Sequence, residues 1–127
     1  MVDGMSEDMV EGVLIAESVR PGAEVDLDVF VRSLSRQVIL EPAEWQPGVW
    51  TLLTFVSDGD PDELAGKLAD ALDQPGWYCD FRTARTTWVV YPGQIFRYPR
   101  GDEAARAEAV EHGRALGVPD VQLDWPR

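Results

Sequence analysis

The chain has 127 residues, of which 45% are hydrophobic, and it carries a formal net charge of −12. This length and apolar content predict one folded domain with a core and exclude a wholly disordered chain. The acidic residues interrupt every group of arginines, which argues against binding to nucleic acid or to an anionic membrane, because both require clustered positive charge.

The first residues, MVDGMSEDM, are acidic, and we predict that residues 1–9 form a flexible tail and residues 10–127 a single α+β domain. A secretory signal would begin with basic residues, and no apolar run approaches the roughly 20 residues that cross a bilayer. The single cysteine, Cys79, cannot form an internal disulfide. These features predict a cytoplasmic protein.

Three strands are expected before the first helix. Residues 12–20 are rich in β-forming residues, and residues 27–39 alternate between apolar and polar side chains, with a bulge expected near Ser33 or Ser35. Residues 48–57 are apolar on both faces, which is typical of a strand inside a sheet.

A helix is expected to begin after Asp60, where Pro61 takes the first helical position and Glu63 completes a capping pattern. It is expected to end at the Pro75-Gly76 pair.

Three further strands are expected at residues 77–82, 86–91 and 94–98, and the last two are joined by a type II turn at Pro92-Gly93. Asp102 is expected to cap a second helix, and the tail DVQLDWPR is expected to form a short edge strand.

The predicted order is therefore β-β-β-α-β-β-β-α. It indicates the α+β class, a mostly antiparallel sheet with two helices on one face. An alternative division of the chain starts at Val49 and gives a ferredoxin-like β-α-β-β-α-β unit with an added N-terminal hairpin.

Cys79 and His112 suggest a thiol nucleophile with its base. However, Cys79 is expected on the apolar side of its strand with Trp77 and Phe81, where a thiol has a raised pKa and is inert. With one histidine and one cysteine, the chain lacks the ligands of a structural zinc site.

Asp58, Asp60 and Asp62 resemble the start of a calcium-binding loop. The match fails because Glu63 stands where glycine is needed and Ala69 where a bidentate glutamate is needed. Glycine-rich nucleotide loops and a nucleophile elbow are also missing. We therefore predict no catalytic residue, no cofactor and no metal site.

The segment from residue 77 to 102 contains seven of the chain's twelve aromatic residues. The side chains expected to face the helices are Trp77, Cys79, Phe81, Trp88, Val90, Phe96 and Tyr98. The other face would then carry Tyr78, Asp80, Arg82, Thr87, Val89, Tyr91, Ile95 and Arg97. Because tyrosine and arginine are enriched where proteins bind one another, we predict a partner-binding surface there. Its predicted residues are Tyr78, Arg82, Val89, Tyr91, Ile95 and Arg97; the competing expectation is that the N-terminal strands or the C-terminal tail cover this face.

The run GWYCDFRTARTTWVVYPGQIFRYPRGDEAARAEAVEHGRALGVP, followed by QLDW, resembles small uncharacterised proteins of actinobacteria. The resemblance implies a bacterial cytoplasmic origin. It implies no activity.

Two hypotheses about function follow. The first is a non-enzymatic accessory, similar to an immunity protein, antitoxin or regulator, that contacts another protein or a second copy of itself through its acidic surface and the Tyr/Arg face. The alternative is a small-molecule-binding or enzymatic domain with a pocket between sheet and helices, near Trp88, Tyr91 and Arg97.

Overall fold

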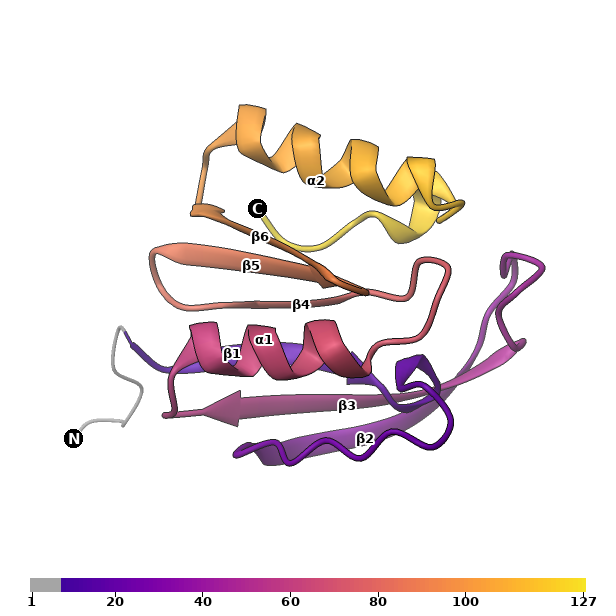
Figure 1. Cartoon of the computed structure of the whole chain (residues 1–127), viewed down its shortest axis with the longest axis horizontal. Coiled ribbons are helices and arrows are strands. Elements are labelled where there is room, and N and C mark those ends of the chain that lie inside the picture. The colour runs from indigo at the N-terminus through magenta and orange to yellow at the C-terminus, as the bar shows by residue number, and fades with distance from the viewer. Residues whose placement is uncertain (1–7) are drawn as a thin grey trace.

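Six strands and two helices follow one another along the chain in the computed structural model, which describes residues 8–127 (Figure 1). The strands are β1 (Val10–Ile15), β2 (Phe30–Val38), β3 (Val49–Ser57), β4 (Cys79–Arg82), β5 (Thr86–Tyr91) and β6 (Gln94–Pro99). Helix α1 (Pro61–Ala71) follows β3, and helix α2 (Glu103–Ala115) follows β6. The predicted α+β class and the predicted order of strands and helices are confirmed.

All six strands belong to one antiparallel sheet, in the order β2-β3-β1-β4-β5-β6. The register of β2 against β3 shifts between Val31 and Ser33, which confirms the predicted bulge. After α2 the chain forms a short 3-10 helix, Asp120–Gln122, and no strand. The edge strand predicted for the tail, and with it the ferredoxin-like alternative, is therefore wrong. Most of the predicted acidic tail, residues 1–9, lies outside the described residues.

Both helices begin where the sequence predicted. The side chain of Asp60 accepts a hydrogen bond from the backbone N–H of Asp62 at 2.9 Å, and that of Asp102 accepts one from Ala105 at 3.0 Å. Each aspartate satisfies a backbone donor in the first helical turn that has no partner inside the helix. No helix in residues 8–127 is both long and apolar enough to cross a membrane.

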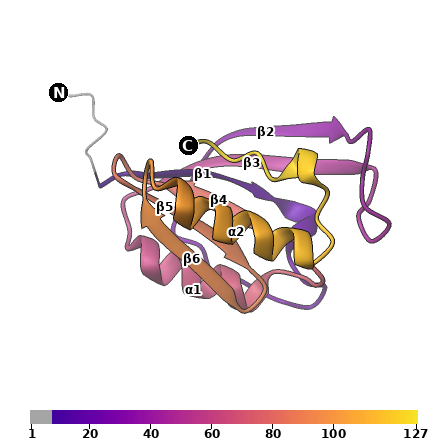
Figure 2. The same cartoon turned by 90° about the horizontal axis from the view of Figure 1, so that it is seen from above.

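The two helices cover opposite faces of the sheet, and the expectation that they share one face is wrong. Trp88 and Val90 of β5 pack in one core with the leucines of α1, whereas Val89 and Tyr91 pack in a second core with Ala109 of α2. Successive strand residues point to opposite faces, so β5 is apolar on both and needs cover on both. In Figure 2, α1 lies along one side of the sheet and the C-terminal segment along the other.

The side chains of β6 also point the other way from the prediction. The turn at Pro92-Gly93 pairs Tyr91 with Gln94, so Phe96 stands opposite Val89 and Arg97 opposite Trp88. Because directly opposed residues share a face, Phe96 and Tyr98 lie on the α2 side. Ile95 and Arg97 consequently lie on the α1 side. The predicted orientation of Cys79 and Phe81 in β4, toward α1, is confirmed.

Strand β2 forms one edge of the sheet, and all nine of its residues are exposed. It includes four large apolar side chains that keep more than half of their surface exposed. These are Phe30 (67%), Val31 (55%), Leu34 (63%) and Val38 (75%). Neither helix covers this part of the sheet.

Candidate functional site

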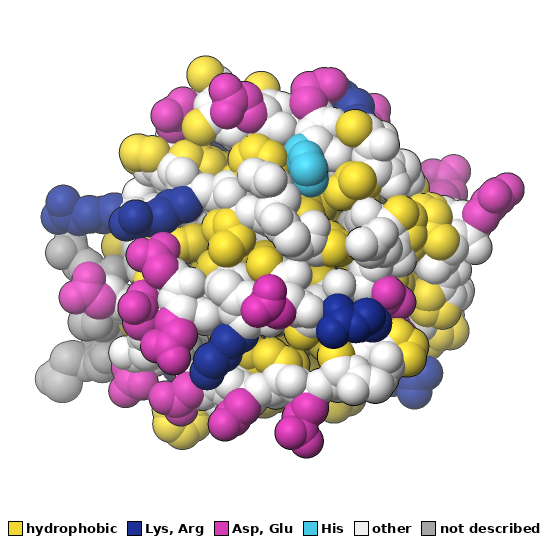
Figure 3. All heavy atoms as spheres, in the orientation of Figure 1, with side chains coloured by type: hydrophobic (Ala, Val, Ile, Leu, Met, Phe, Trp, Pro, Cys, Tyr) yellow, Lys and Arg dark blue, Asp and Glu magenta, His cyan; other side chains and the backbone are white. Residues whose placement is uncertain are grey.

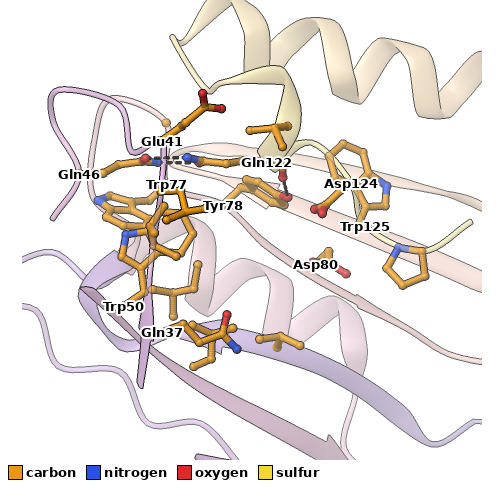
Figure 4. Close-up of a pocket in the computed structure, with 18 of the residues that line it drawn as sticks. Gln37, Glu41, Gln46, Trp50, Trp77, Tyr78, Asp80, Gln122, Asp124 and Trp125 are labelled. Carbon is orange, nitrogen blue, oxygen red and sulfur yellow. Dashed lines mark hydrogen bonds between the residues drawn. The ribbon is translucent and has the colours of Figure 1, made fainter. Parts of the chain in front are cut away.

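A groove with a volume of about 820 Å³ lies on the sheet face opposite α1 (Figure 4). Its floor is made by side chains of β1, β3 and β4, including Val13, Ile15 and Leu52. One wall is the connection from β2 to β3, and the other is the C-terminal segment, residues 121–126. The groove exists because α2 and this segment cover only part of the face and leave β1 and β3 open.

Four aromatic rings contribute to the groove. Trp50 and Trp77 meet edge to face, with ring centroids 5.2 Å apart, and Tyr78 and Trp125 meet in the same manner at 5.4 Å. The indole N–H of Trp50 donates to the carbonyl of Pro47 at 2.9 Å, and that of Trp125 donates to the hydroxyl of Tyr98 at 2.7 Å. Since both N–H groups are satisfied within the protein, these rings offer mainly carbon surface to a bound molecule.

A pair of glutamines joins the two walls. Each of Gln46 and Gln122 donates its side-chain amide to the other's carbonyl oxygen at 2.8 Å, and both bonds are drawn in Figure 4. The hydroxyl of Tyr78 donates to the backbone carbonyl of Gln122. The guanidinium of Arg106 also lies over the Trp125 ring, 4.8 Å from the ring centroid. These contacts fix the C-terminal wall against the sheet.

The floor contains a largely buried ion pair. The Nη2 atom of Arg82 donates to Asp80 Oδ2 at 2.6 Å, and its Nη1 atom lies 3.8 Å from a carboxylate oxygen of Glu11. Burial has the largest effect on the Asp80 carboxyl and raises its pKa. The guanidinium of Arg82 lowers the pKa, and the charge of Asp124 raises it. The pKa is therefore above the ordinary value. Among residues 8–127, Arg82 Nε is the one buried side-chain nitrogen or oxygen without a hydrogen-bond partner.

Tyr78 lies between this pair and the C-terminal wall. Burial raises the pKa of its hydroxyl well above the ordinary value, and the negative charges of Asp80 and Asp124 raise it further. The hydroxyl therefore stays protonated at neutral pH and acts as a hydrogen-bond donor.

The structure does not support a Cys79–His112 pair. Cys79 is buried in the core beneath α1, where loss of solvent raises the pKa of its thiol well above the ordinary value. His112 lies on the other side of the sheet, with its ring centroid 4.8 Å from that of Tyr91 and 5.3 Å from that of Phe96. The sheet therefore separates the nucleophile from its base.

Residues 8–127 contain no group of three or more His, Cys, Asp and Glu side chains placed to hold a metal ion. Two of the three aspartates that resemble a calcium loop have structural partners. Asp60 caps α1, and Asp62 accepts a hydrogen bond from the indole N–H of Trp88 at 2.9 Å and lies 3.7 Å from Arg97.

The six predicted partner-binding residues do not form one surface. Tyr78 and Arg82 line the groove. Val89 and Tyr91 are completely buried, and the Tyr91 hydroxyl donates to the carbonyl of Ala109 in α2 at 2.9 Å. Ile95 and Arg97 lie on the α1 side, where the Arg97 guanidinium is 5.6 Å from the Trp88 ring centroid.

Sequence reasoning missed several groove residues: Trp50, Leu52, Gln46, Gln122, Asp124 and Trp125. One signal was available, since a strand that is apolar on both faces, such as residues 48–57, needs cover on both. The missing cover was not visible in the sequence, because it depends on where the C-terminal segment lies.

Comparisons with protein-family models, with curated proteins and with solved structures found no match to this chain. The groove's own geometry and chemistry are therefore the basis for a functional proposal.

Proposed function

We propose that the protein binds a small, largely apolar organic molecule in the groove. The observation that carries this proposal is the cavity of about 820 Å³ lined by Trp50, Trp77, Tyr78 and Trp125. Ligand sites are typically concave, about 300–1,000 Å³ in volume, and mostly apolar with a few placed polar groups. Both the size and the lining of the groove fit this description.

The rigidity of the walls also supports binding. The Gln46–Gln122 pair and the buried Trp125 hold the two walls in place without a ligand. A site that is formed in advance does not have to be ordered when the ligand binds, which improves affinity.

We propose binding rather than catalysis, because the two largely buried titratable groups of the groove, Asp80 and Tyr78, have partners within the protein. Asp80 is paired with Arg82, and the Tyr78 hydroxyl is hydrogen bonded to the backbone. The proposed compartment is the cytoplasm, where a single reduced cysteine such as Cys79 is usual.

The neutral fluorescent probe N-phenyl-1-naphthylamine tests the proposal. We expect its fluorescence to rise on binding to the wild-type protein. Leu52→Trp, which places an indole in the groove, should weaken probe binding at least about tenfold. Val49→Trp is the matched control, because Val49 is on β3 but outside the groove lining. Absence of probe binding to the wild type, or equal loss in both variants, would contradict the proposal.

A second candidate function is association with a second copy of the chain through β2. A long, exposed edge strand with unpaired backbone groups is a template for strand pairing. Two copies of β2, paired about a twofold axis, would bury Leu34 and Val38 of both chains and continue the sheet. In this candidate the function is still contact between protein chains, but the contact surface is β2 rather than the predicted Tyr/Arg face.

Sedimentation equilibrium of the purified protein tests this candidate. We expect a concentration-dependent dimer that Leu34→Lys converts to a monomer. Ile95→Lys, on the opposite edge strand β6, should leave the dimer unchanged. A wild-type protein that remains monomeric up to millimolar concentration would rule the candidate out.

A further inference from the structure

We infer that the ligand of the groove is an organic cation, with an amine or quaternary ammonium head group and an apolar body. The inference rests on the proposed ligand-binding function and adds the chemical class of the ligand. It is carried by the charges of the lining residues and by where they lie.

The lining of the groove has an excess of negative charge. Three carboxylates line it, from Glu41, Asp80 and Asp124, against one cation, Arg82. Arg82 is already held by Asp80 at 2.6 Å and by Glu11 at 3.8 Å, so its charge is largely compensated inside the protein. The same pair neutralises Asp80, which leaves Asp124 and Glu41 as the uncompensated charges of the lining; both repel an anion and attract a cation.

Two of the three carboxylates lie at one end of the groove, and Glu41 lies at the other end, on the side of Gln46 and Trp77 (Figure 4). In the view of Figure 4, Asp80 and Asp124 lie on one side of Tyr78, and Trp50 and Trp77 lie on the other. A molecule with a charged head and an apolar body fits this division, with the head near the two aspartates and the body over Trp50.

The environment strengthens the attraction at the charged end. The side chain of Asp80 is only 15% exposed and is paired with Arg82, so Asp124 is the free carboxylate at this end. Tyr78 and Trp125 adjoin the aspartates, and the electron-rich ring of the half-buried Tyr78 also favours a cation. The net charge of −12 raises the local concentration of any cation around the molecule.

Three ten-carbon molecules that differ in head-group charge test the inference: decyltrimethylammonium, decanol and decyl sulfate, each below its micellar concentration. Each displaces N-phenyl-1-naphthylamine from the wild-type protein in a fluorescence titration. We expect decyltrimethylammonium to compete best and decyl sulfate worst, with at least about a tenfold difference between them. The difference should shrink as salt rises from 20 mM to 0.5 M, because ions screen the attraction.

Substitution of Asp124 tests whether the preference for the cation arises in the groove. Asp124 is exposed at the rim, so its replacement should leave the fold intact. Asp124→Asn should reduce the preference for the cation to about threefold, and Asp124→Lys should abolish it. Asp26→Asn is the control, because it changes the net charge equally at an exposed position outside the groove.

The outcomes separate the inference from the function on which it rests. If the neutral probe binds but decyl sulfate competes as well as decyltrimethylammonium, the ligand class is wrong and the groove remains a binding site. If Asp26→Asn changes the preference as much as Asp124→Asn, the global charge is responsible, and the inference is again wrong. If the neutral probe does not bind, the proposed function itself is overturned.

Discussion

Strands β5 and β2 are the extremes of burial in this sheet. Five of the six residues of β5 are buried, whereas all nine residues of β2 are exposed. Both sequences, TTWVVY and FVRSLSRQV, contain several apolar residues. The difference therefore comes from what covers each strand, with α1 on one face of β5 and α2 on the other, and neither helix over β2.

This contrast shows how the groove arises. On one face α1 packs against residues of β1, β3, β4 and β5. On the other face α2 and the C-terminal segment cover mainly β5 and β6, and the groove lies where this cover ends, above β1 and β3. On the face that carries α1, acidic side chains lie among basic and hydrophobic groups (Figure 3).

The same substitution in the two halves of the sheet gives the largest expected difference. Phe81 is fully buried and stacks on Trp88 with centroids 5.5 Å apart, whereas Phe30 of β2 is 67% exposed. We expect Phe81→Ala to lower the free energy of unfolding by about 3–5 kcal/mol and Phe30→Ala by less than about 1 kcal/mol. Urea unfolding measures both, and comparable losses would show that β2 is covered in solution.

Two helix glycines test how closely each helix approaches the sheet. A Cβ atom at Gly113 of α2 would lie 2.6 Å from the Tyr91 hydroxyl and 2.7 Å from Leu123 Cδ2, whereas one at Gly66 of α1 would have no neighbour within 4 Å. We expect Gly113→Ala to destabilise the protein by about 1–3 kcal/mol through overpacking. Gly66→Ala should stabilise it by about 0.5–1 kcal/mol through helix propensity. Thermal unfolding of both variants checks this, and stabilisation by Gly113→Ala would contradict the close packing of α2.

The smallest expected effect concerns Glu17, at the end of the open half of the sheet. Partial burial alone would raise the pKa of Glu17. Hydrogen bonds from the N–H and hydroxyl of Thr51, at 2.6 and 2.8 Å, and the charge of Arg36 outweigh it and lower the pKa below the ordinary value. A lowered folded-state pKa stabilises the protein above the unfolded-state pKa, and this contribution is lost as the pH falls through the folded-state value. Glu17→Gln should therefore cost less than about 1 kcal/mol at pH 7.

Urea unfolding of wild type and Glu17→Gln at pH 7 and pH 3 measures this contribution. The difference between the two proteins should shrink at the lower pH. A difference that grows as the pH falls would show that the Thr51 contact does not favour the charged carboxylate.

The local sequence determined where both helices begin and where β5 turns back into β6. The caps at Asp60 and Asp102, the turn at Pro92-Gly93 and the inward orientation of Cys79 all followed from residues close to one another in the chain. Hydrogen bonds within a turn and alternation along a strand act over a few residues, so their signals are readable without a partner.

The tertiary structure decided which face each helix covers and which apolar residues remain open. The groove brings together Val13, Trp50, Tyr78 and Trp125, which lie on four separate segments of the chain. The burial of Val89 and Tyr91, predicted as surface residues, likewise depends on α2 crossing to the second face. Burial is a property of the whole packing, because an apolar strand is covered only if another element with its own connections can reach it.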